Sequence, residues 1–387
     1  MKPLIQPLDP SYSTLPKTPS PFFDDYEYVN RLIIIGNGFD LAHGLKSSFT
    51  AFILNYFTKS IRHLHLNQKY QDTLINIEKN LGFSNSDMLR DIADIDAYNI
   101  VMALSNHGKF KVTWNSPFFK SIVKEIHEKN WVDVEIHYFD FLKTKRIINN
   151  PKEVAKLNSD FEFIKNCFIK YLEEELNKHQ FTLSKDIAKQ FNESIKVKDT
   201  IPKTINKDRK PNQVCILNFN YTNIVELYRS HLNSAEHHYI PIHGELSAIE
   251  KSGQEPIFGF GDEMDEDYTK FELMRNDDLF QHIKSFKYLQ FKHYLNLIEF
   301  IGHSPFQVQI FGHSCGLSDR TLLNTIFEHE NCISIKPFYY DKNGTNDYEK
   351  KSYAIARHFK SKARLRVTVV NKEYCEAMFQ PFTPEQN

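Results

Sequence analysis

"RLIIIGNGFDLAHGLKSSF" spans residues 31–49 and decides the fold of this chain. Its apolar run, Leu32–Ile35, is short and rich in β-branched residues, which is typical of a buried strand. Gly36 and Gly38 follow at once, and glycine permits a tight turn and lets backbone N–H groups approach an anion closely. The third glycine of the dinucleotide-binding fingerprint is replaced by Leu41. From its residues alone, the stretch predicts either a phosphate-binding turn or a tight corner in a hydrophobic core.

Asn37, Phe39 and Asp40 complete this turn. The charge of Asp40 repels phosphate, so we expect its carboxylate to cap the following helix or to hydrogen-bond a ribose.

Further strands are expected in the second half of the chain. Short apolar runs predict strands at 214–220, 239–244, 308–314, 332–340 and 365–370, and helices are expected at 222–232, 281–301, 319–328 and 346–361. Strands that alternate with helices indicate a mostly parallel sheet. Between the first strand and these, helices are expected near 85–104, 116–128, 131–145, 152–178 and 183–195. The sequence therefore predicts an α/β fold: a Rossmann-like, mostly parallel sheet with a large helical insertion after the first strand and helix.

This organisation divides the chain into three parts. Residues 28–60 and 206–387 would form the Rossmann-like core, residues 61–205 the mainly helical insertion, and residues 1–27, with their six prolines, a flexible arm.

Composition excludes several classes of protein. The formal net charge is −1, so there is no global basic field for nucleic acid. The five cysteines are scattered without a C-x-x-C pair, which argues against a disulfide scaffold or a cysteine zinc site and fits a reducing cytoplasm. No apolar run approaches the ~20 residues that span a bilayer, and the N-terminus lacks the apolar stretch of a signal peptide. We therefore expect a cytoplasmic protein that does not contact membranes.

Two polar motifs follow predicted strands. "LNFNYTNIVE" places Asn218, Asn220 and Tyr221 at a strand end, where ligands bind in open α/β sheets. Two amides separated by one residue share one side of a strand and could hold a ribose hydroxyl or a water. Helix capping is the structural alternative, and the residues alone favour it. "PIHGEL" places His243 at another strand end, as a general base or as a structural hydrogen-bonding residue.

A fourth motif, "IFGHSCGLSD", holds Gly312, His313, Ser314 and Asp319. Gly312 and Ser314 could meet a phosphate or a ribose, whereas Asp319 could simply cap the next helix. G-H-S-C-G also matches the G-x-S-x-G pattern of a nucleophile elbow, with Ser314 central. That interpretation is weak because Asp319 follows too closely to be the usual third partner.

These motifs and their order resemble the AbiH family of bacteriophage abortive-infection proteins. The resemblance rests on "LIIIGNGFDLAHGL", "WVDVE", "NFNYT", "HGEL", "FGFGDE" and "IFGHSCGLSD", and it spans residues 31–340. At longer range the motif order is similar to that of sirtuin-like NAD-consuming domains.

The distant similarity implies roles for particular residues. Gly36 and Gly38 would face a pyrophosphate, Asn220 the nicotinamide ribose, and His243 would be the general base, while Gly312 and Ser314 would lie near the adenosine. Phe39 could wall the nicotinamide pocket. Asn37, Asp40, Asn218, Tyr221, His313 and Asp319 complete the set expected to bind NAD. Thr222 stands where sirtuins have an aspartate, and the sirtuin zinc cysteines are absent. The resemblance therefore implies NAD hydrolysis to ADP-ribose and nicotinamide in phage defence, without a metal.

Other functions stay open at this point. Asp133 and Glu135 of "WVDVE" could ligate Mg²⁺ or Mn²⁺, together with Asp40, Asp262, Glu263 or His313, in a nuclease. Alternatively, the first two only begin a helix and favour its dipole. A non-catalytic sensor of NAD or ADP-ribose would use the same crevice.

Two expectations concern motion and partners. "GFGDEMDEDYTKFE" predicts a solvated lid with Gly259 and Gly261 as hinges. The expected partners are NAD or a related nucleotide, a phage-derived trigger and, through Phe-rich helices, further copies of this chain in a homo-oligomer. Core packing is the commoner use of such apolar stripes.

Overall fold

The computed structural model describes residues 26–67, 69–79, 110–129, 133–202, 204–234, 236–252 and 254–381. Residues 1–25 of the Pro-rich arm and the helix expected near 85–104 lie outside the described residues.

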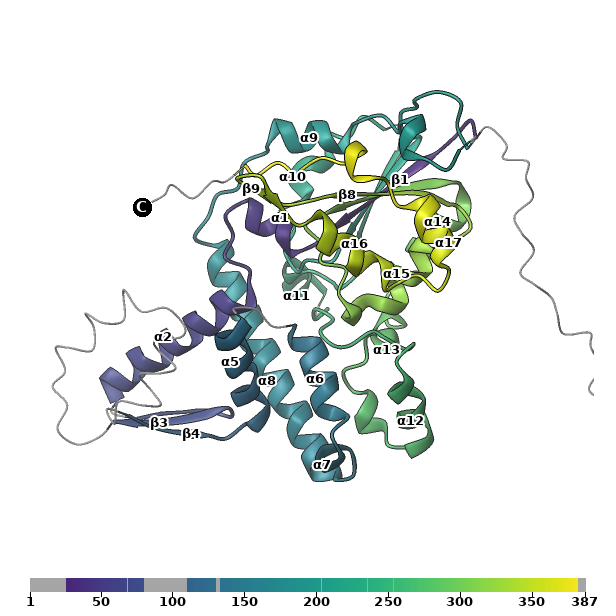
Figure 1. Cartoon of the computed structure of the whole chain (residues 1–387). Helices are drawn as coiled ribbons and strands as arrows, with labels where there is room; N and C mark the ends of the chain where they lie inside the picture. Colours follow the sequence, from purple (N-terminus) through teal and green to yellow (C-terminus); the bar gives the residue numbers. More distant parts are fainter. Residues whose placement is uncertain are drawn as a thin grey trace, which may run out of the picture.

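A five-stranded parallel sheet forms the centre of the molecule (Figure 1). Its strands are β1 (Asn30–Ile35), β5 (Gln213–Asn218), β6 (Glu236–Pro241), β7 (Phe306–Phe311) and β8 (Cys332–Phe338), and their order is β6-β5-β1-β7-β8. β1 pairs in parallel with β5 on one side and with β7 on the other. The strand order reverses between β1 and β7, as in Rossmann folds, and ligands bind such sheets outside the strand ends at this switch point. The expected Rossmann-like α/β fold is confirmed.

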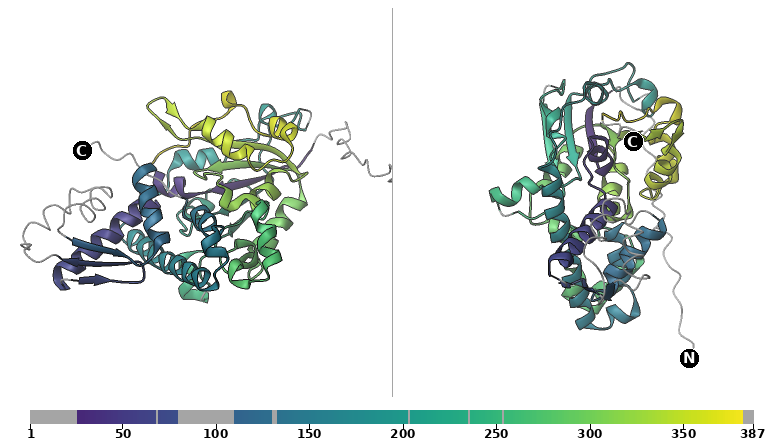
Figure 2. Two further views of the ribbon diagram at one scale, coloured as in Figure 1. Left: turned by 60° about the horizontal axis from the view of Figure 1, so that its bottom comes forward. Right: turned by 90° about the vertical axis from the view of Figure 1, so that its left-hand side faces the viewer.

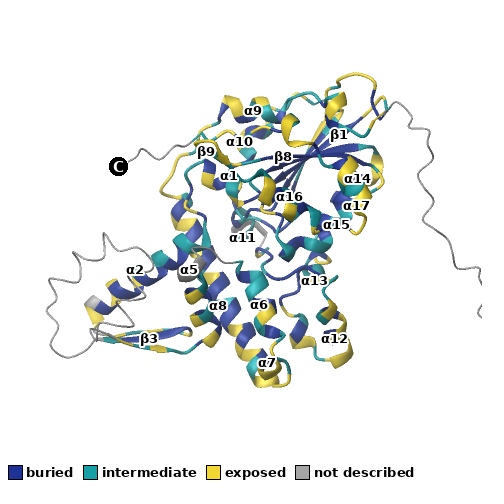
Figure 3. Cartoon of the chain, viewed as in Figure 1, coloured by how far each residue is buried: buried dark blue, intermediate teal, exposed yellow. Residues whose placement is uncertain are grey.

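Both faces of the sheet are covered, which explains the continuous apolar run of β1. Ile33 and Ile35 pack on one face against α9 (Lys185–Phe191) and α10 (Glu226–Arg229). Leu32 and Ile34 pack on the other face against α14 (His293–His303) and α15 (Arg320–Phe327). All four side chains are fully buried, so each residue of this apolar run contributes to one of the two cores. Figure 3 shows the strands of the central sheet as largely buried.

The insertion lies at one end of the sheet (Figures 1 and 2). Its helices are α5 (Pro117–Lys129), α6 (Val134–Leu142), α7 (Lys145–Ile148) and α8 (Pro151–Leu176), together with α2 (Phe49–Asn67), which begins within the range expected for the core. An antiparallel three-stranded sheet joins them, formed by β2 (Lys69–Gln71), β3 (Ile75–Lys79) and β4 (Phe110–Trp114). One aromatic-rich core holds the insertion together, and Phe52, Phe119 and Phe161 belong to it. By contrast α9, which lies within the expected range 61–205, packs on the central sheet.

Shorter elements complete the described chain. They are α1 (Asn37–Ala42), η1 (Val197–Asp199), α11 (Leu246–Ser252), α12 (Glu266–Met274), η2 (Asp277–Phe280), α13 (Lys284–Tyr288), η3 (Leu317–Asp319), β9 (Asp341–Lys342), β10 (Thr345–Asn346), α16 (Tyr348–Ala356), α17 (Lys362–Thr368) and η4 (Lys372–Tyr374).

The strand predicted at 365–370 is wrong, because most of this run lies in α17. The side chain of Ser361 accepts a hydrogen bond from the Arg364 backbone N–H and so starts a helix. Only Val369, at the end of the run, forms a bridge with Ile335 of β8. A local cap therefore overrides the β propensity of the valines.

The continuous helix predicted over 281–301 is also wrong. Phe260 forms a parallel bridge with Ile283, and the Lys284 N–H donates to the Phe260 carbonyl. This extended pairing separates η2 from α13, and α14 begins only at His293. The break matters because it turns Lys284 toward the ends of the central strands.

Within the described ranges, no helix has both the length and the apolar character that crossing a membrane requires.

Candidate functional site at the switch point

A cavity of about 410 Å³ lies at the carboxyl ends of β1, β5 and β7. We call it the switch-point pocket. Residues that follow the strands of the central sheet line one part of it. Residues from the starts of α2 and α6 and from α8 line the rest. The lining residues are Gly36, Asn37, Gly38, Asp40, Leu41, Ser47, Ser48, Phe49, Thr50, Asp133, Val134, Glu135, Phe168, Leu172, Phe219, Asn220, Tyr221, Thr222, His243, Phe258, Gly312, His313, Ser314, Ser318 and Asp319. Gly38, Asn220, His243 and Ser314, which lie far apart in the sequence, thus meet in one cavity.

The glycines of the first and fourth motifs bring two turns into direct contact. The Gly36 N–H donates to the Phe311 carbonyl at 3.0 Å, and the Gly38 N–H donates to the Gly312 carbonyl at 2.8 Å. A Cβ on Gly36 would lie 2.4 Å from His313 Cα, and one on Gly312 would lie 2.1 Å from the Phe39 nitrogen. The expectation that the Gly36 and Gly38 amides approach a phosphate is therefore wrong. Their hydrogen bonds are already used, and the glycines serve close packing.

Asp40 is buried and bonded inside the protein. Its Oδ1 accepts from Asn220 Nδ2 at 2.9 Å, and its Oδ2 accepts from the hydroxyl of Thr222. Burial raises the pKa of Asp40 to about 7 although both hydrogen bonds lower it. The expected helix cap is wrong, because Gly36 is the N-cap of α1 and no side chain caps that helix. Asp40 instead links the first motif to the second.

Phe39 and Asn37 differ in their positions. Phe39 is fully buried and packs against Phe191 and Tyr228 under the sheet, outside the lining of the pocket. Its expected role as a wall of the ligand pocket is therefore wrong, because the helix α1 turns its ring toward the core. Asn37 lines the pocket, and its side-chain oxygen accepts a hydrogen bond from Ser47.

The two asparagines of the second motif have separate roles. Asn218 Nδ2 donates to the Thr222 carbonyl and to the Tyr239 hydroxyl, and its oxygen accepts from the Asn220 N–H. Asn218 therefore shapes the turn and lies outside the lining of the pocket, contrary to the expectation that it binds a ligand. The strand ends at Asn218, so the two amides do not share a strand face. Asn220 and Tyr221 do line the cavity.

His243 is buried and contacts a hydrogen-bonding partner at each ring nitrogen. Nδ1 lies 3.2 Å from the Phe219 carbonyl, and Nε2 lies 3.1 Å from the Tyr288 hydroxyl and 3.2 Å from Asp319 Oδ1. The carbonyl and the carboxylate only accept, so both are satisfied by the imidazolium form. Burial and the positive charge of Lys284 oppose that form and lower the pKa of His243.

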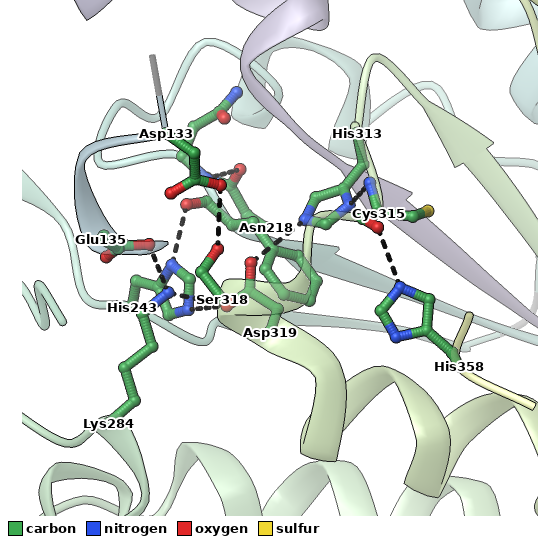
Figure 4. A network of polar contacts seen from close by, with 12 residues as sticks. Asp133, Glu135, Asn218, His243, Lys284, His313, Cys315, Ser318, Asp319 and His358 are labelled. Carbon is green, nitrogen blue, oxygen red and sulfur yellow. Dashed lines mark hydrogen bonds and ion pairs between the residues drawn. The ribbon is translucent and has the colours of Figure 1, made fainter. Parts of the chain in front are cut away.

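Asp319 is the centre of a buried charge network (Figure 4). Its Oδ1 lies 2.8 Å from Lys284 Nζ, which also contacts Glu135 Oε2 at 2.8 Å. Burial disfavours the carboxylate, but the charges of Lys284 and His243 outweigh it and lower the pKa of Asp319 well below its usual range. Asp319 is therefore a charged member of the site. Its expected capping bond to α15 is not made.

Glu135 and Lys284 form the other end of this network. Glu135 Oε1 accepts from the Gly259 N–H at 2.9 Å, and burial raises its pKa. Lys284 is fully buried, yet the two carboxylates hold the pKa of its ammonium group well above the usual value against the effect of burial. Sequence reasoning missed Lys284, because a lysine in an expected amphipathic helix carries no signal that it is buried.

His313 and Ser314 do not form a nucleophile elbow. The Cys315 N–H donates to His313 Nδ1 at 3.0 Å, and burial lowers the pKa of His313 to about 3. Cys315, and not Ser314, has the positive φ, at 53°. Among the described residues, Ser314 donates to no histidine, and His358 Nε2 binds the Cys315 carbonyl instead. His313 and Ser314 both line the pocket.

The carboxylates of "WVDVE" begin a helix and also reach the pocket. Asp133 is the N-cap of α6, where its Oδ1 accepts from the Ile136 N–H, and Glu135 lies in the first turn. Across the described ranges, no group of three or more His, Cys, Asp or Glu side chains is arranged to hold a metal ion. The contacts of Glu135 are with Lys284 and a backbone amide, as described above.

The expected lid is wrong. Asp262 is buried and pairs with Arg320 at 3.2 Å, and α12 begins shortly after it. A Cβ on Gly259 would lie 2.2 Å from the His282 carbonyl oxygen, and one on Gly261 would lie 2.7 Å from that of Ser318. These glycines allow the segment to pack closely against the backbones of His282 and Ser318.

The strand order and the position of the cavity define a Rossmann-like α/β protein with a pocket at its switch point. The chain belongs to the AbiH family, because the family model described as bacteriophage abortive infection AbiH matches residues 32–341. This membership implies a function in abortive phage infection. Comparison with curated proteins found no match, and neither did comparison with solved structures.

Proposed function

We propose that this AbiH protein hydrolyses NAD to ADP-ribose and nicotinamide in the switch-point pocket. The observation that carries the proposal is the charge of the pocket. Its described lining includes four acidic residues, Asp40, Asp133, Glu135 and Asp319, and no lysine or arginine. Lys284 lies behind this lining and pairs with Glu135 and Asp319. The acidic side chains outnumber this one cation, so the cavity suits a cationic group, and the nicotinamide-ribose end of NAD is cationic. The charge disfavours a phosphate at the centre of the pocket.

The chemistry needs little more than a fixed ribose and a positioned water. The bond between C1′ of the ribose and the ring nitrogen breaks, and its electron pair leaves with neutral nicotinamide. Positive charge then develops on the ribose, where nearby carboxylates stabilise it in a partly water-excluded cavity. Water adds to C1′ and releases one proton, which gives ADP-ribose.

Residues predicted as catalytic support this proposal by their positions. Asn220 lines the pocket, and its amide nitrogen is held by Asp40, so its side-chain oxygen is the group left to accept from a ribose hydroxyl. His243 lies beside Asp319, which stabilises positive charge on its ring. Phe49, Phe168 and Phe258 give the cavity an aromatic wall for the nicotinamide ring.

The test is release of nicotinamide from NAD by purified protein, with binding of ADP-ribose measured in parallel. We expect wild type to release nicotinamide and Asn220→Ala and His243→Ala to lose at least about tenfold in rate. His237→Ala is the matched control, since His237 is exposed on β6 and lies outside the lining of the pocket. If wild type bound ADP-ribose but released no nicotinamide, the protein would be a sensor and not a hydrolase. Neither binding nor release, in the presence of phage lysate as a source of trigger, would refute the proposal.

A further inference from the structure

We propose that Asp133 is the general base of this pocket, the group that takes the proton of the attacking water. This inference rests on the proposed function and assigns one of its steps to a residue outside the motifs expected to be catalytic.

The backbone holds Asp133 in place and leaves an oxygen for a ligand. As the N-cap of α6, its Oδ1 accepts from the Ile136 N–H at 3.0 Å, which fixes the carboxylate at the helix start. Its Oδ2 lies 3.5 Å from Ser318 Oγ, at the limit of a hydrogen bond (Figure 4). Since a carboxylate oxygen accepts two hydrogen bonds, Oδ2 can accept another one from a water in the pocket.

Because Gly316 has no side chain, Asp133 of the insertion can approach the turn that follows β7. A Cβ on Gly316 would lie 3.1 Å from Asp133 Oδ2 and 3.6 Å from the hydroxyl oxygens of Ser314 and Ser318. The second glycine of "GHSCG" thus lets the carboxylate approach this turn closely. The hydroxyl groups of Ser314 and Ser318 also line the pocket and offer further hydrogen-bonding partners for a water there.

The other titratable groups of the lining are engaged more strongly. Asp319 and Glu135 each contact Lys284 at 2.8 Å, and Asp40 accepts from Asn220 and Thr222. Both ring nitrogens of His243 have partners within 3.2 Å. Among the described acidic residues of the pocket, Asp133 has the weakest side-chain contacts. Its carboxylate can therefore accept a proton from a bound water. Burial raises its pKa, which also favours proton uptake.

The C1′–nitrogen bond breaks and its electron pair leaves with nicotinamide. The water oxygen bonds to C1′, its proton passes to Asp133 Oδ2, and the protonated carboxyl later returns that proton to solvent. The buried network then has a positioning role. It consists of His243, Asp319 and Lys284, and it holds these charged groups in place beside the reacting ribose.

The decisive variant is Asp133→Asn. Asparagine is also a good N-cap, so α6 keeps its start, but the amide cannot take a proton. We expect nicotinamide release to fall at least about 100-fold while ADP-ribose binding changes less than about twofold. Azide, a nucleophile that needs no base, should restore turnover in the variant and give a ribosyl azide. Asp265→Asn is the matched control, because Asp265 is likewise an N-cap, accepts from the Asp267 N–H at the start of α12, and lies outside the lining of the pocket; this variant should act like wild type.

Each outcome decides the matter. Wild-type rates in Asp133→Asn, with wild type active, would overturn the base and leave the proposed function standing. Loss of ADP-ribose binding together with activity, or failure of azide to restore turnover, would also overturn the base and make Asp133 a binding residue. If wild type releases no nicotinamide, both the proposed function and the proposed base are refuted.

Discussion

The N–H of Gly38 donates to the carbonyl of Gly312 at 2.8 Å, so the turns after β1 and β7 are packed backbone to backbone. Gly312 has φ +68° and no room for a side chain, whereas Gly344 has φ +84° and nothing within 4 Å of an added Cβ. We therefore expect Gly344→Ala to lose about 1 kcal/mol from backbone strain alone. Gly312→Ala should lose several times more, or fail to fold, as measured by urea unfolding. Equal losses in the two variants would contradict the packing of the two turns.

Asp40 should make stability depend on pH. Its pKa rises from 3.8 to about 7 on folding, so the folded state holds the proton more tightly than the unfolded state does. The contribution of Asp40 to stability is therefore greatest below pH 3.8 and is lost as the pH rises to about 7. At ~1.4 kcal/mol per pKa unit, the loss is at most about 4 kcal/mol.

Asp40→Asn removes this titration. The unfolding free energy of wild type minus that of the variant should fall between pH 4 and pH 7, which are roughly the limits set by the two pKa values. A difference that is flat or rises over this range would show that Asp40 is ionised and stabilised in the folded protein.

Lys284 should be a large contributor to stability, because it is fully buried between Glu135 and Asp319. Lys284→Met leaves two buried carboxylates without a cation, which we expect to cost about 3–5 kcal/mol at neutral pH. The loss should shrink in acid as Glu135 takes a proton. Lys59→Met is the control, since Lys59 pairs with Glu174 at the surface and exposed pairs contribute about 0–1 kcal/mol. Similar losses in both variants by thermal unfolding would argue against the buried network.

Asn218 should matter for folding and not for the ligand. Asn218→Ala leaves the Thr222 carbonyl, the Tyr239 hydroxyl and the Asn220 N–H without this partner, which we expect to cost about 1–3 kcal/mol. If the proposed function is correct, the folded variant should bind ADP-ribose with the affinity of wild type. Calorimetry of the variant below its unfolding transition checks this, and a weaker affinity with unchanged stability would restore Asn218 to the ligand site.

The sheet was predictable because its strands carry strong local signals. The apolar run of β1 and the polar turns after β5 and β7 follow from sequence period and from the position of strand ends in α/β folds. The failed strand at 365–370 and the failed helix at 281–301 have different causes. In the first, the side chain of Ser361 starts a helix, a local signal that the apolar run outweighed in the prediction. In the second, pairing of Ile283 with the distant Phe260 breaks a helix, and this contact is not visible in a window of local sequence.

The site was predictable in its location and less so in its contacts. Strand-end motifs correctly bring Asn220 and His243 to one cavity, because topology alone places them there. The contacts of Phe39 and Asn218 depend on the packing of α1 and on one tyrosine hydroxyl, so their roles could not be read from spacing. Lys284 and the carboxylate of Asp133 come from segments whose position relative to the sheet only the folded structure gives.

The position of β1 also sets an order of events during synthesis. This strand is made first, yet its two neighbours in the sheet begin at Gln213 and Phe306. Pairing between such distant segments closes long loops and is slow. A nascent chain that has not reached β7 therefore carries an apolar strand with an open edge and lacks Asp319. The switch-point pocket therefore cannot form until synthesis has passed the fourth motif, because Gly312, His313 and Asp319 belong to its lining.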